Sequence, residues 1–329
     1  MSARIALFSL GGTIAMTPGA QGGGVQPTLT GEQLLAGVPG LADLDVEIEA
    51  RDFRRLPGAS LSFDDLRSLA NAIGDCDADG VVITQGTDTI EETAYLLDLL
   101  HTGRTPLVVT GAMRNPTMAS ADGPANVLAA IEVAADPAAH GRGCLVVFAD
   151  EIHAACRVRK THSTSVATFA SPNGGALGHL VEGRARFLSA PGERVTVRLA
   201  PEAGFRRVAL VTATLGDDGE ILRAVADRAD GLVVAAMGVG HVPESYLDAL
   251  TELAGRMPVL LASRTGAGSV LSRTYGYPGS ESDLLARGLT GAGFLHPYKA
   301  RILLTVLLTA GASWDEIVET VSRAGAVRA

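Results

Sequence analysis

Short apolar runs alternate with helix-like patterns along the first 190 residues. The runs are rich in Val, Ile and Leu, and most are too continuous for strands with one solvated face. Between them, apolar residues recur at the three- and four-residue spacing of an amphipathic helix. This pattern predicts a mostly parallel sheet flanked by helices, with strands at residues 4–9, 46–53, 81–84, 106–110 and 144–148.

A second strand–helix series follows a break in this rhythm. Residues 187–205 lack periodicity and contain Pro191, Gly192, Pro201 and Gly204. Beyond them, strands are predicted at 208–212, 232–236 and 259–263, and helices at 221–228, 244–256 and 303–308. The chain is therefore expected to form two α/β domains, residues 1–190 and 208–329, with a linker at 191–207.

Several predicted helices begin with capping signals. The predicted caps are Thr30 with Gln33, Ser62 before the helix 63–73, and Ser313 with Glu316. The helix that starts near residue 90 allows the same structural interpretation. There, Asp88 with Glu91, or Thr89 with Glu92, has the spacing of a capping box.

Residues 81–95 also allow a functional interpretation. The apolar strand is followed by polar residues and one glycine, and only then by the helical pattern. In an open α/β sheet, ligands bind outside the carboxyl ends of the strands. Thr87 and Asp88 would lie there, at the start of the helix.

Glycine-containing turns end two more of the predicted strands. Residues 10–15 (LGGTIA) follow the first strand and residues 111–114 (GAMR) follow the fourth. Glycines let the backbone turn sharply, which would expose the Thr13 hydroxyl and nearby amides. The turn lacks the third glycine of a dinucleotide-binding fingerprint. Residues 17–28 are predicted to be a flexible loop and a candidate lid over Thr13.

Composition and charge narrow the class of protein. Apolar residues make up 47% of the chain, the net charge is −9 and no basic face is evident, which disfavours nucleic-acid binding. The three cysteines are far apart, which suits a reducing compartment and gives no zinc signature. The first apolar run is too short for a signal peptide, and no run reaches the roughly 20 residues of a membrane span. A cytoplasmic location is expected.

Lysine is rare in this chain. Of the 27 basic residues, only Lys160 and Lys299 are lysines. Arginine is always protonated, whereas a buried lysine can lose its proton, so a site that needs a proton acceptor cannot use arginine. Lys160 lies in a polar segment and would be costly to bury without a partner such as Asp88.

These residues together resemble the bacterial-type L-asparaginase family, the asparaginase/glutaminase amidohydrolases. The matching segments are residues 10–15, 79–94 (DGVVITQGTDTIEETA), 111–114, 120–124 (SADGP), 160–161, 166–169 (VATF) and 297–301 (PYKAR). The resemblance implies a larger N-terminal and a smaller C-terminal α/β domain. It also implies a homotetramer built as a pair of intimate dimers, with active sites between domains of adjacent subunits.

The resemblance implies catalytic roles for four residues. Thr13 matches the family's first nucleophilic threonine, whose hydroxyl attacks the side-chain amide and gives an acyl-enzyme and ammonia. Thr87, Asp88 and Lys160 match the second catalytic group, in which a neutral lysine draws a proton through Asp88 or Thr87. The sequence leaves open which threonine attacks first.

It also implies a set of substrate contacts. The backbone amides of Thr13 and Ala112 are the implied oxyanion donors, and Gly86 belongs to the substrate-binding turn. Asp88 would receive the substrate ammonium group.

Two further contacts are less closely fixed by the alignment. Ser60 matches the contact to the α-carboxylate, with Gly58 or Ala59 as alternatives. Glu281 matches an acid that reaches a neighbouring subunit's site, the alternative being an exposed loop carboxylate. Lys299 matches a structural position.

The chain departs from the family pattern in two places. The mobile loop of the family commonly carries a tyrosine, but residues 23–26 are GGVQ and no tyrosine precedes Tyr95. The asparagine expected after the Gly-Val-Gly of the second domain is also missing, and residues 240–243 are GHVP. Both departures concern substrate selection more than the hydroxyl–lysine chemistry.

The sequence therefore predicts a cofactor-free amidohydrolase that converts L-asparagine to L-aspartate and ammonia. One alternative is an amidase for glutamine, D-asparagine or another ω-amide. A role in transfer-RNA amidation would need a further N-terminal domain, and the chain starts at its first strand. A non-enzymatic amino-acid sensor would be expected to lack Thr13, Thr87 or Lys160, and all three are present.

Overall fold

Two units make up the structure, a computed structural model that describes residues 2–18, 25–225 and 227–326. They are Met1–Pro191 and Gly192–Ala329, here called the N-terminal and C-terminal units. Each unit contains a sheet with helices packed on it, so the predicted two-domain α/β fold is confirmed. The bounds of the linker, 191–207, stay a prediction.

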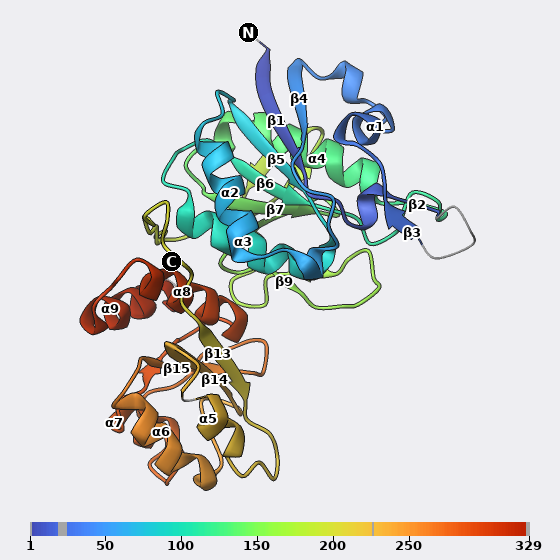
Figure 1. The fold of residues 1–329 in the computed structure, drawn as a ribbon. Coiled ribbons are helices and arrows are strands. Elements are labelled where there is room, and N and C mark those ends of the chain that lie inside the picture. Colours follow the sequence, from blue (N-terminus) through green and yellow to red (C-terminus); the bar gives the residue numbers. More distant parts are fainter. Residues whose placement is uncertain (1, 19–24, 226, 327–329) are drawn as a thin grey trace. The chain divides into compact units, whose positions relative to one another are not determined.

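The N-terminal unit is built on an eight-stranded sheet in the order β12-β11-β8-β7-β6-β5-β1-β4 (Figure 1). Strands β4, β1, β5, β6 and β7 are parallel, whereas β8, β11 and β12 pair antiparallel, so the sheet is mostly parallel as predicted. The bounds are β1 Ala3–Ser9, β4 Val46–Asp52, β5 Gly80–Thr84, β6 Leu107–Thr110, β7 Cys144–Phe148, β8 Glu151–Ala154, β11 Gly178–Val181 and β12 Arg184–Phe187.

Helices cover both faces of this sheet, which explains the continuous apolar strands. Figure 1 shows α2 and α3 in front of the sheet and α4 behind it. The bounds are α1 Gly31–Ala36, α2 Phe63–Gly74, α3 Ile90–Leu100 and α4 Gly123–Ala135. At Gly80, an added β-carbon would lie 2.2 Å from the carbonyl oxygen of Ala134, so α4 packs directly on the backbone of β5.

The predicted caps of α1 and α2 are confirmed. The Thr30 hydroxyl accepts from the Gln33 amide, and the Ser62 hydroxyl accepts from the Asp65 amide. In both helices the third residue returns the bond to the backbone of the cap.

The predicted irregular loop at 17–28 is wrong at its two ends. Met16–Pro18 (β2) pairs antiparallel with Val25–Pro27 (β3), because an extended segment can satisfy its backbone groups by pairing with its own return strand. Residues 19–24, on which the predicted lid depends, lie outside the described residues.

Lys160 lies on a strand that is separate from the eight-stranded sheet. Strand β9 (Arg159–Lys160) pairs with β10 (Phe169–Ala170) in a separate two-stranded sheet. Phe169 is the partner of Lys160 in this pairing, and its ring packs against Phe148 of β7 with 4.8 Å between centroids. The small sheet is therefore docked on the unit by an aromatic contact.

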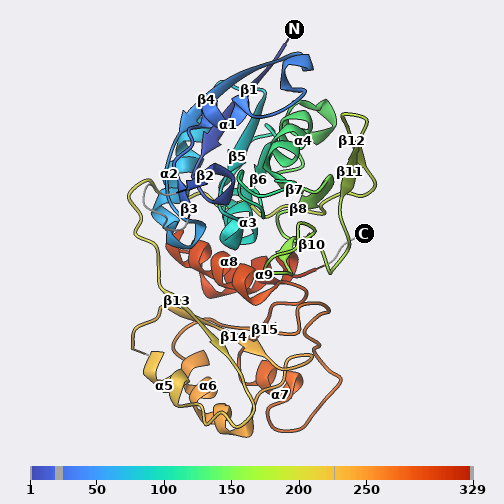
Figure 2. The same cartoon turned by 90° about the vertical axis from the view of Figure 1, so that its right-hand side faces the viewer.

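The C-terminal unit contains a four-stranded parallel sheet in the order β13-β14-β15-β16 (Figure 2). Its strands are β13 Val208–Thr212, β14 Gly231–Ala236, β15 Val259–Ser263 and β16 Thr290–Gly291. Its helices are α5 Glu220–Val225, α6 Leu247–Ala254, α7 Glu281–Ala286, α8 Pro297–Thr309 and α9 Trp314–Ala324.

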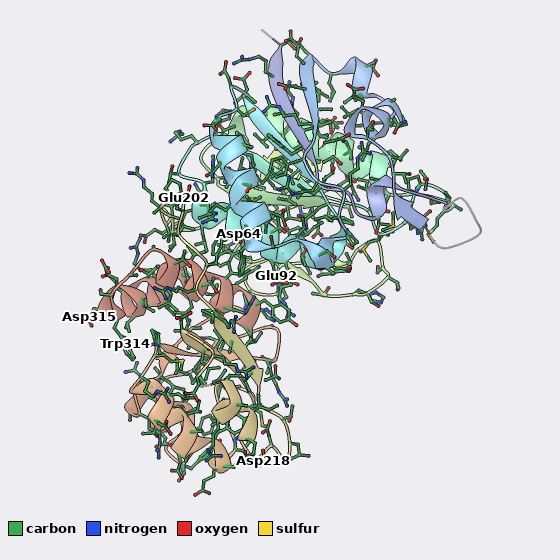
Figure 3. All side chains as sticks on the ribbon, viewed as in Figure 1. Asp64, Glu92, Glu202, Asp218, Trp314 and Asp315 are labelled. Atoms are coloured by element: carbon green, nitrogen blue, oxygen red, sulfur yellow. The ribbon has the colours of Figure 1, made fainter. Side chains whose placement is uncertain are left out.

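Several helix bounds of this unit differ from the prediction. Helix α8 begins at Pro297, six residues before the predicted apolar segment at 303–308, because His296 caps it and proline suits the first turn. Helices α5 and α6 are shorter than predicted. The predicted cap of α9 is confirmed, since the Ser313 hydroxyl accepts from the Glu316 amide. Trp314 and Asp315 then lie at the surface of the unit (Figure 3).

Among the residues that the structure describes, no helix is both long enough and apolar enough to cross a membrane.

Candidate active site

The carboxyl ends of β1, β5 and β6 meet at one edge of the N-terminal sheet. The Leu10 amide donates to the Thr84 carbonyl at 2.8 Å, and the Gln85 amide donates to the Thr110 carbonyl at 3.1 Å. The turns that follow these three strands therefore begin side by side. This edge is where open α/β sheets bind ligands.

Three glycines bring the turns into backbone contact. Gly12 follows β1, Gly58 follows β4 and Gly86 follows β5. A β-carbon on Gly58 would lie 2.9 Å from the Gly86 carbonyl oxygen, and one on Gly86 would lie 3.0 Å from the Gly58 nitrogen. Gly12 approaches the Gly86 backbone as well. Each turn carries a predicted site residue close to its glycine. The backbone contact therefore brings together the turns of Thr13, Ser60 and Thr87.

Thr13 stands at the start of a 3₁₀ helix, Thr13–Ala15, directly after the glycine pair. Gly11 and Gly12 have φ values of 96° and 85°, a region that favours glycine over other residues. Thr13 is half-buried, and the next residue, Ile14, is buried with Gly123 of α4 beside it. The prediction that glycines create the sharp turn before Thr13 is confirmed.

Lys160 joins Thr87 and Asp88 through its side chain. Its Nζ atom lies 3.0 Å from Thr87 Oγ1 and 2.8 Å from Asp88 Oδ1. The predicted pairing of Lys160 with Asp88 is confirmed. The lysine side chain is 15% exposed and the aspartate side chain 67% exposed, so one end of the ion pair remains open to solvent and to a ligand.

Both predicted capping boxes at the start of α3 are wrong. Thr89 is the N-cap residue, but its side chain makes no capping bond and instead donates to the Gly58 carbonyl at 3.0 Å. Glu91 does not cap either, because its Oε1 atom accepts from the Lys160 amide at 3.2 Å. These side chains bind groups that are distant in sequence, which the local spacing could not reveal.

The turn after β6 is held by two side chains at the start of α4. Asp122 accepts from the amides of Met113 and Arg114, at 3.0 and 2.8 Å. The Asn126 side chain donates to the Gly111 carbonyl at 3.0 Å. The sequence predicts Asp122 at a helix start, within the matching segment 120–124, and it does not single out Asn126. The segment 120–124, near residues 111–114 in sequence, was the available signal.

Ala112 and Ser60 lie on turns of the same edge. Ala112 is buried, and Gly111 before it is so close to the Gln85 carbonyl that a β-carbon there would lie at 2.6 Å. Ser60 ends the 3₁₀ helix Gly58–Ser60 and is exposed, whereas Gly58 is buried against Gly86. Which residue of this turn binds a carboxylate stays a prediction.

Glu281 belongs to the C-terminal unit, where it is the first residue of α7. Its relative exposure is 0%, so the alternative of an exposed loop carboxylate is wrong. Oε1 accepts from the amides of Thr274 and Tyr275, both at 2.8 Å, and Oε2 lies 3.2 Å from His241 Nε2. The carboxylate folds inward because these donors satisfy it there. Its predicted contact with substrate is untested.

His241 connects Glu281 with an exposed phenol. The Tyr277 hydroxyl lies 2.8 Å from His241 Nδ1. Partial desolvation of its hydroxyl raises the pKa of Tyr277, and the negative charge of Glu281 raises it further. Burial opposes the ionised form of Glu281, but the hydrogen bonds from the Tyr275 and Thr274 amides and from His241 outweigh it and lower the pKa. The histidine noted in the sequence thus belongs to a hydrogen-bonded chain.

The second lysine of the chain has a structural position. Lys299 is fully buried in helix α8 of the C-terminal unit.

Among the described residues, no group of three or more His, Cys, Asp and Glu side chains is arranged to hold a metal ion.

Comparison with known proteins identifies the family. The sequence profile described as "Asparaginase, N-terminal" matches residues 4–192, and that described as "Glutaminase/Asparaginase C-terminal domain" matches residues 207–320. The chain belongs to the asparaginase family. The family resemblance and the two-domain asparaginase-like fold expected from the sequence are both confirmed.

Several asparaginases are similar over most of their length. The "Probable L-asparaginase" of Deinococcus radiodurans is 40% identical, with 95% of each chain covered. L-asparaginase 2 of Escherichia coli is 34% identical, over 93% of this chain and 88% of that protein. The crystal structure titled "Probable Cytoplasmic L-asparaginase" from Campylobacter jejuni superposes with a TM-score of 0.86 at 31% identity, covering 98% and 99% of the two chains.

Proposed function

We propose that this asparaginase-family protein hydrolyses the side-chain amide of L-asparagine to give L-aspartate and ammonia. One observation carries the proposal most directly: Lys160 Nζ contacts both the Thr87 hydroxyl and the Asp88 carboxylate. A hydroxyl next to an amine supported by an acid is the arrangement that activates a nucleophile for acyl transfer. The similarity to L-asparaginases over nearly the whole chain supports asparagine as the substrate.

In the proposed reaction, a threonine hydroxyl attacks the amide carbon. Lys160, in its neutral form, accepts the proton of that hydroxyl and returns it to the departing nitrogen, which leaves as ammonia. The threonine is then an ester of the aspartyl group. Water cleaves this ester, and its proton follows the same route back to the threonine oxygen. Either Thr13 or Thr87 supplies the hydroxyl.

The same edge of the sheet supplies the proposed substrate contacts. Asp88 is exposed and would receive the α-ammonium group, and Ser60 on the neighbouring turn would receive the α-carboxylate. Gly86, at the start of the turn that carries Thr87 and Asp88, is proposed as a further substrate contact. The amides of Thr13 and Ala112 would stabilise the oxyanion as negative charge develops on the carbonyl oxygen. Glu281 is proposed as a second ammonium contact.

A preference for glutamine is the second candidate. It is favoured by the match of residues 207–320 to a domain that glutaminases and asparaginases share. The same hydroxyl and lysine would act, and one extra methylene in the substrate would change only the fit. Hydrophobic pockets distinguish one methylene by about 1–3 kcal/mol, so partial activity on both amides is compatible with this site.

We further propose a homotetramer, arranged as a pair of intimate dimers, and a cytoplasmic location. The similar Campylobacter jejuni protein is titled cytoplasmic, which supports the location. Light scattering of the purified protein at several concentrations tests the assembly, and fractionation of the source cells tests the location.

Ammonia release by the purified protein tests the activity. L-asparagine, D-asparagine and L-glutamine are offered separately, at micromolar and millimolar concentrations. Turnover of L-asparagine is expected, and it should be lost in Thr13→Ala and Lys160→Ala while circular dichroism stays unchanged. Silence of the wild type on all three amides, or unchanged turnover in both variants, would contradict the proposal.

A further inference from the structure

Lys160 needs an anchor because its strand has little support of its own. Strand β9 contains two residues, and among the described strands it pairs with the equally short β10 alone. Within the part of the chain that the structure describes, these two strands form a sheet separate from the eight-stranded one. The side chain that reaches Thr87 and Asp88 therefore starts from a strand that lies outside the main sheet and is joined to it through the packing of Phe169 on Phe148.

Glu91 supplies such an anchor at the backbone of Lys160. Its Oε1 atom accepts from the Lys160 amide at 3.2 Å. Its Oε2 atom lies 3.9 Å from Arg159 Nε, which is within ion-pair range but beyond a hydrogen bond. The Glu91 side chain is 6% exposed, so water competes little for these contacts. The Glu91 carboxylate thus contacts both residues of β9.

The anchor and the reacting groups share one short segment. Glu91 lies in the first turn of α3, four residues after Thr87 and three after Asp88. Residues at this spacing lie on one side of a helical segment. Lys160 is therefore attached twice to the same segment, by its amide to Glu91 and by its Nζ atom to Thr87 and Asp88. The closed loop of contacts fixes both the origin and the end of the lysine side chain.

We infer that Glu91 is a positioning residue for Lys160. It touches no reacting atom, and it acts by holding the backbone from which the lysine side chain extends. This inference rests on the proposed function, because it assigns Glu91 a role in that reaction. It predicts that loss of Glu91 lowers kcat and leaves KM nearly unchanged, since the proposed substrate contacts at Asp88 and Ser60 remain in place.

The chain offers a closely matched control in the same helix. Asp98 is also buried in α3, and its Oδ1 atom accepts from the Cys144 amide of β7 at 2.9 Å. Glu91→Ala and Asp98→Ala each remove a buried carboxylate that binds a backbone amide. Only the first of these amides belongs to Lys160. Any loss that comes from weakening α3 should therefore appear in both variants.

The experiment measures kcat and KM per folded molecule for both variants. We expect Glu91→Ala to lower kcat roughly 10- to 100-fold, the cost of a small misplacement of a catalytic group, and Asp98→Ala to stay within about threefold of wild type. Equal kcat values in the two variants would overturn the inference. Glu91→Gln keeps an oxygen that can accept from the Lys160 amide, so it should recover most of the lost kcat.

Amide hydrogen exchange at Lys160 separates this inference from the proposed function. In Glu91→Ala the Lys160 amide should exchange much faster than in wild type, whereas Asp98→Ala and Glu91→Gln should retain its protection. This result requires no turnover, so it decides the anchoring even if no amide is hydrolysed. Full protection in Glu91→Ala, or retained protection with lost kcat in Glu91→Gln, would show that Glu91 does not act by positioning.

Discussion

Gly12 and Gly86 touch through their backbones. A β-carbon on Gly12 would lie 2.1 Å from the nitrogen and 2.3 Å from the α-carbon of Gly86, distances at which no side chain fits. Each glycine directly precedes a threonine, Thr13 or Thr87. The contact therefore brings together the backbones of the two turns that carry the threonines of the proposed reaction.

Gly12→Ala should disrupt both stability and activity. The new methyl group would force the turns after β1 and β5 apart, and Gly12 has a φ of 85° that alanine adopts at a cost. Overpacking of this kind costs about 1–3 kcal/mol of unfolding free energy. We expect that loss in urea denaturation, with ammonia release reduced far more than the remaining folded fraction explains.

Gly74→Ala is the control for this substitution. Gly74 is the last residue of α2, and a β-carbon there would meet nothing within 4 Å. Alanine favours a helix over glycine by about 1 kcal/mol, so this variant should be as stable as wild type or more so. Wild-type activity and stability in Gly12→Ala would show that the two turns separate without consequence.

Asp122 offers a test of the turn that carries Ala112. Asp122→Ala removes the acceptor for the Met113 and Arg114 amides and leaves the turn free to shift. Because the proposed oxyanion donor is the neighbouring Ala112 amide, kcat/KM for L-asparagine should fall roughly 10- to 100-fold. Steady-state kinetics of the folded variant checks this expectation.

Asp136→Ala controls for the loss of a carboxylate that binds two amides. Asp136 accepts from the amides of Ala138 and Ala185, at 2.9 and 3.1 Å, away from the turns that carry the proposed site. This variant should keep its kcat/KM whatever stability it loses. If both variants lose kcat/KM equally, the effect of Asp122 is a general one on the fold and not on the turn.

The sequence predicted the elements of the site better than their mutual contacts. Local capping was predicted correctly at Thr30 and Ser62, where the partner is three residues away. The same spacing gave a wrong prediction at Thr89 and Glu91. In the folded unit the Thr89 hydroxyl donates to the Gly58 carbonyl, and the Glu91 carboxylate accepts from the Lys160 amide. Spacing describes neighbours along the chain and is silent on partners that only the fold supplies.

The free-energy cost of burying a charge predicted a contact between residues far apart in sequence, which residue spacing could not do. The expense of burying a lone ammonium group led to the pairing of Lys160 with Asp88, although they are 72 residues apart. The sequence predicts only that the glycines before Thr13 let the backbone turn, whereas in the structure Gly12, Gly58 and Gly86 allow a close approach of three turns. Glu281 was expected either at a substrate or in an exposed loop, and its buried bonds to the Thr274 and Tyr275 amides had no counterpart in the sequence pattern.

Lys160→Arg tests whether the lysine acts as a proton acceptor. Arginine keeps the positive charge beside Asp88, but it stays protonated at any working pH. If Lys160 moves a proton, kcat should fall about 10²- to 10⁴-fold while KM changes little. Arg157→Lys is the control, because it exchanges the same residue types on the connection before β9. Full activity of Lys160→Arg would mean that Lys160 acts only as a fixed charge.

Glu281 should make the stability of the C-terminal unit depend on pH. Burial opposes its ionised form, but the Tyr275 and Thr274 amides and His241 stabilise the carboxylate, so its pKa is lower in the folded state than in the unfolded state. A lowered pKa adds stability above the ordinary glutamate value, about 4.3, and that stability is lost as the pH falls through the folded pKa. Glu281→Gln should therefore be less stable than wild type at pH 7 by about 1–3 kcal/mol, the worth of hydrogen bonds to a charged group. The stabilities of the two proteins should converge in acid, which urea denaturation across a pH series measures.

Glu252→Gln is the control for this substitution. It alters an exposed ion pair with Arg256 and should change stability by less than about 1 kcal/mol at any pH. A constant difference between wild type and Glu281→Gln down to acid pH would show that the charge of Glu281 does not stabilise the unit.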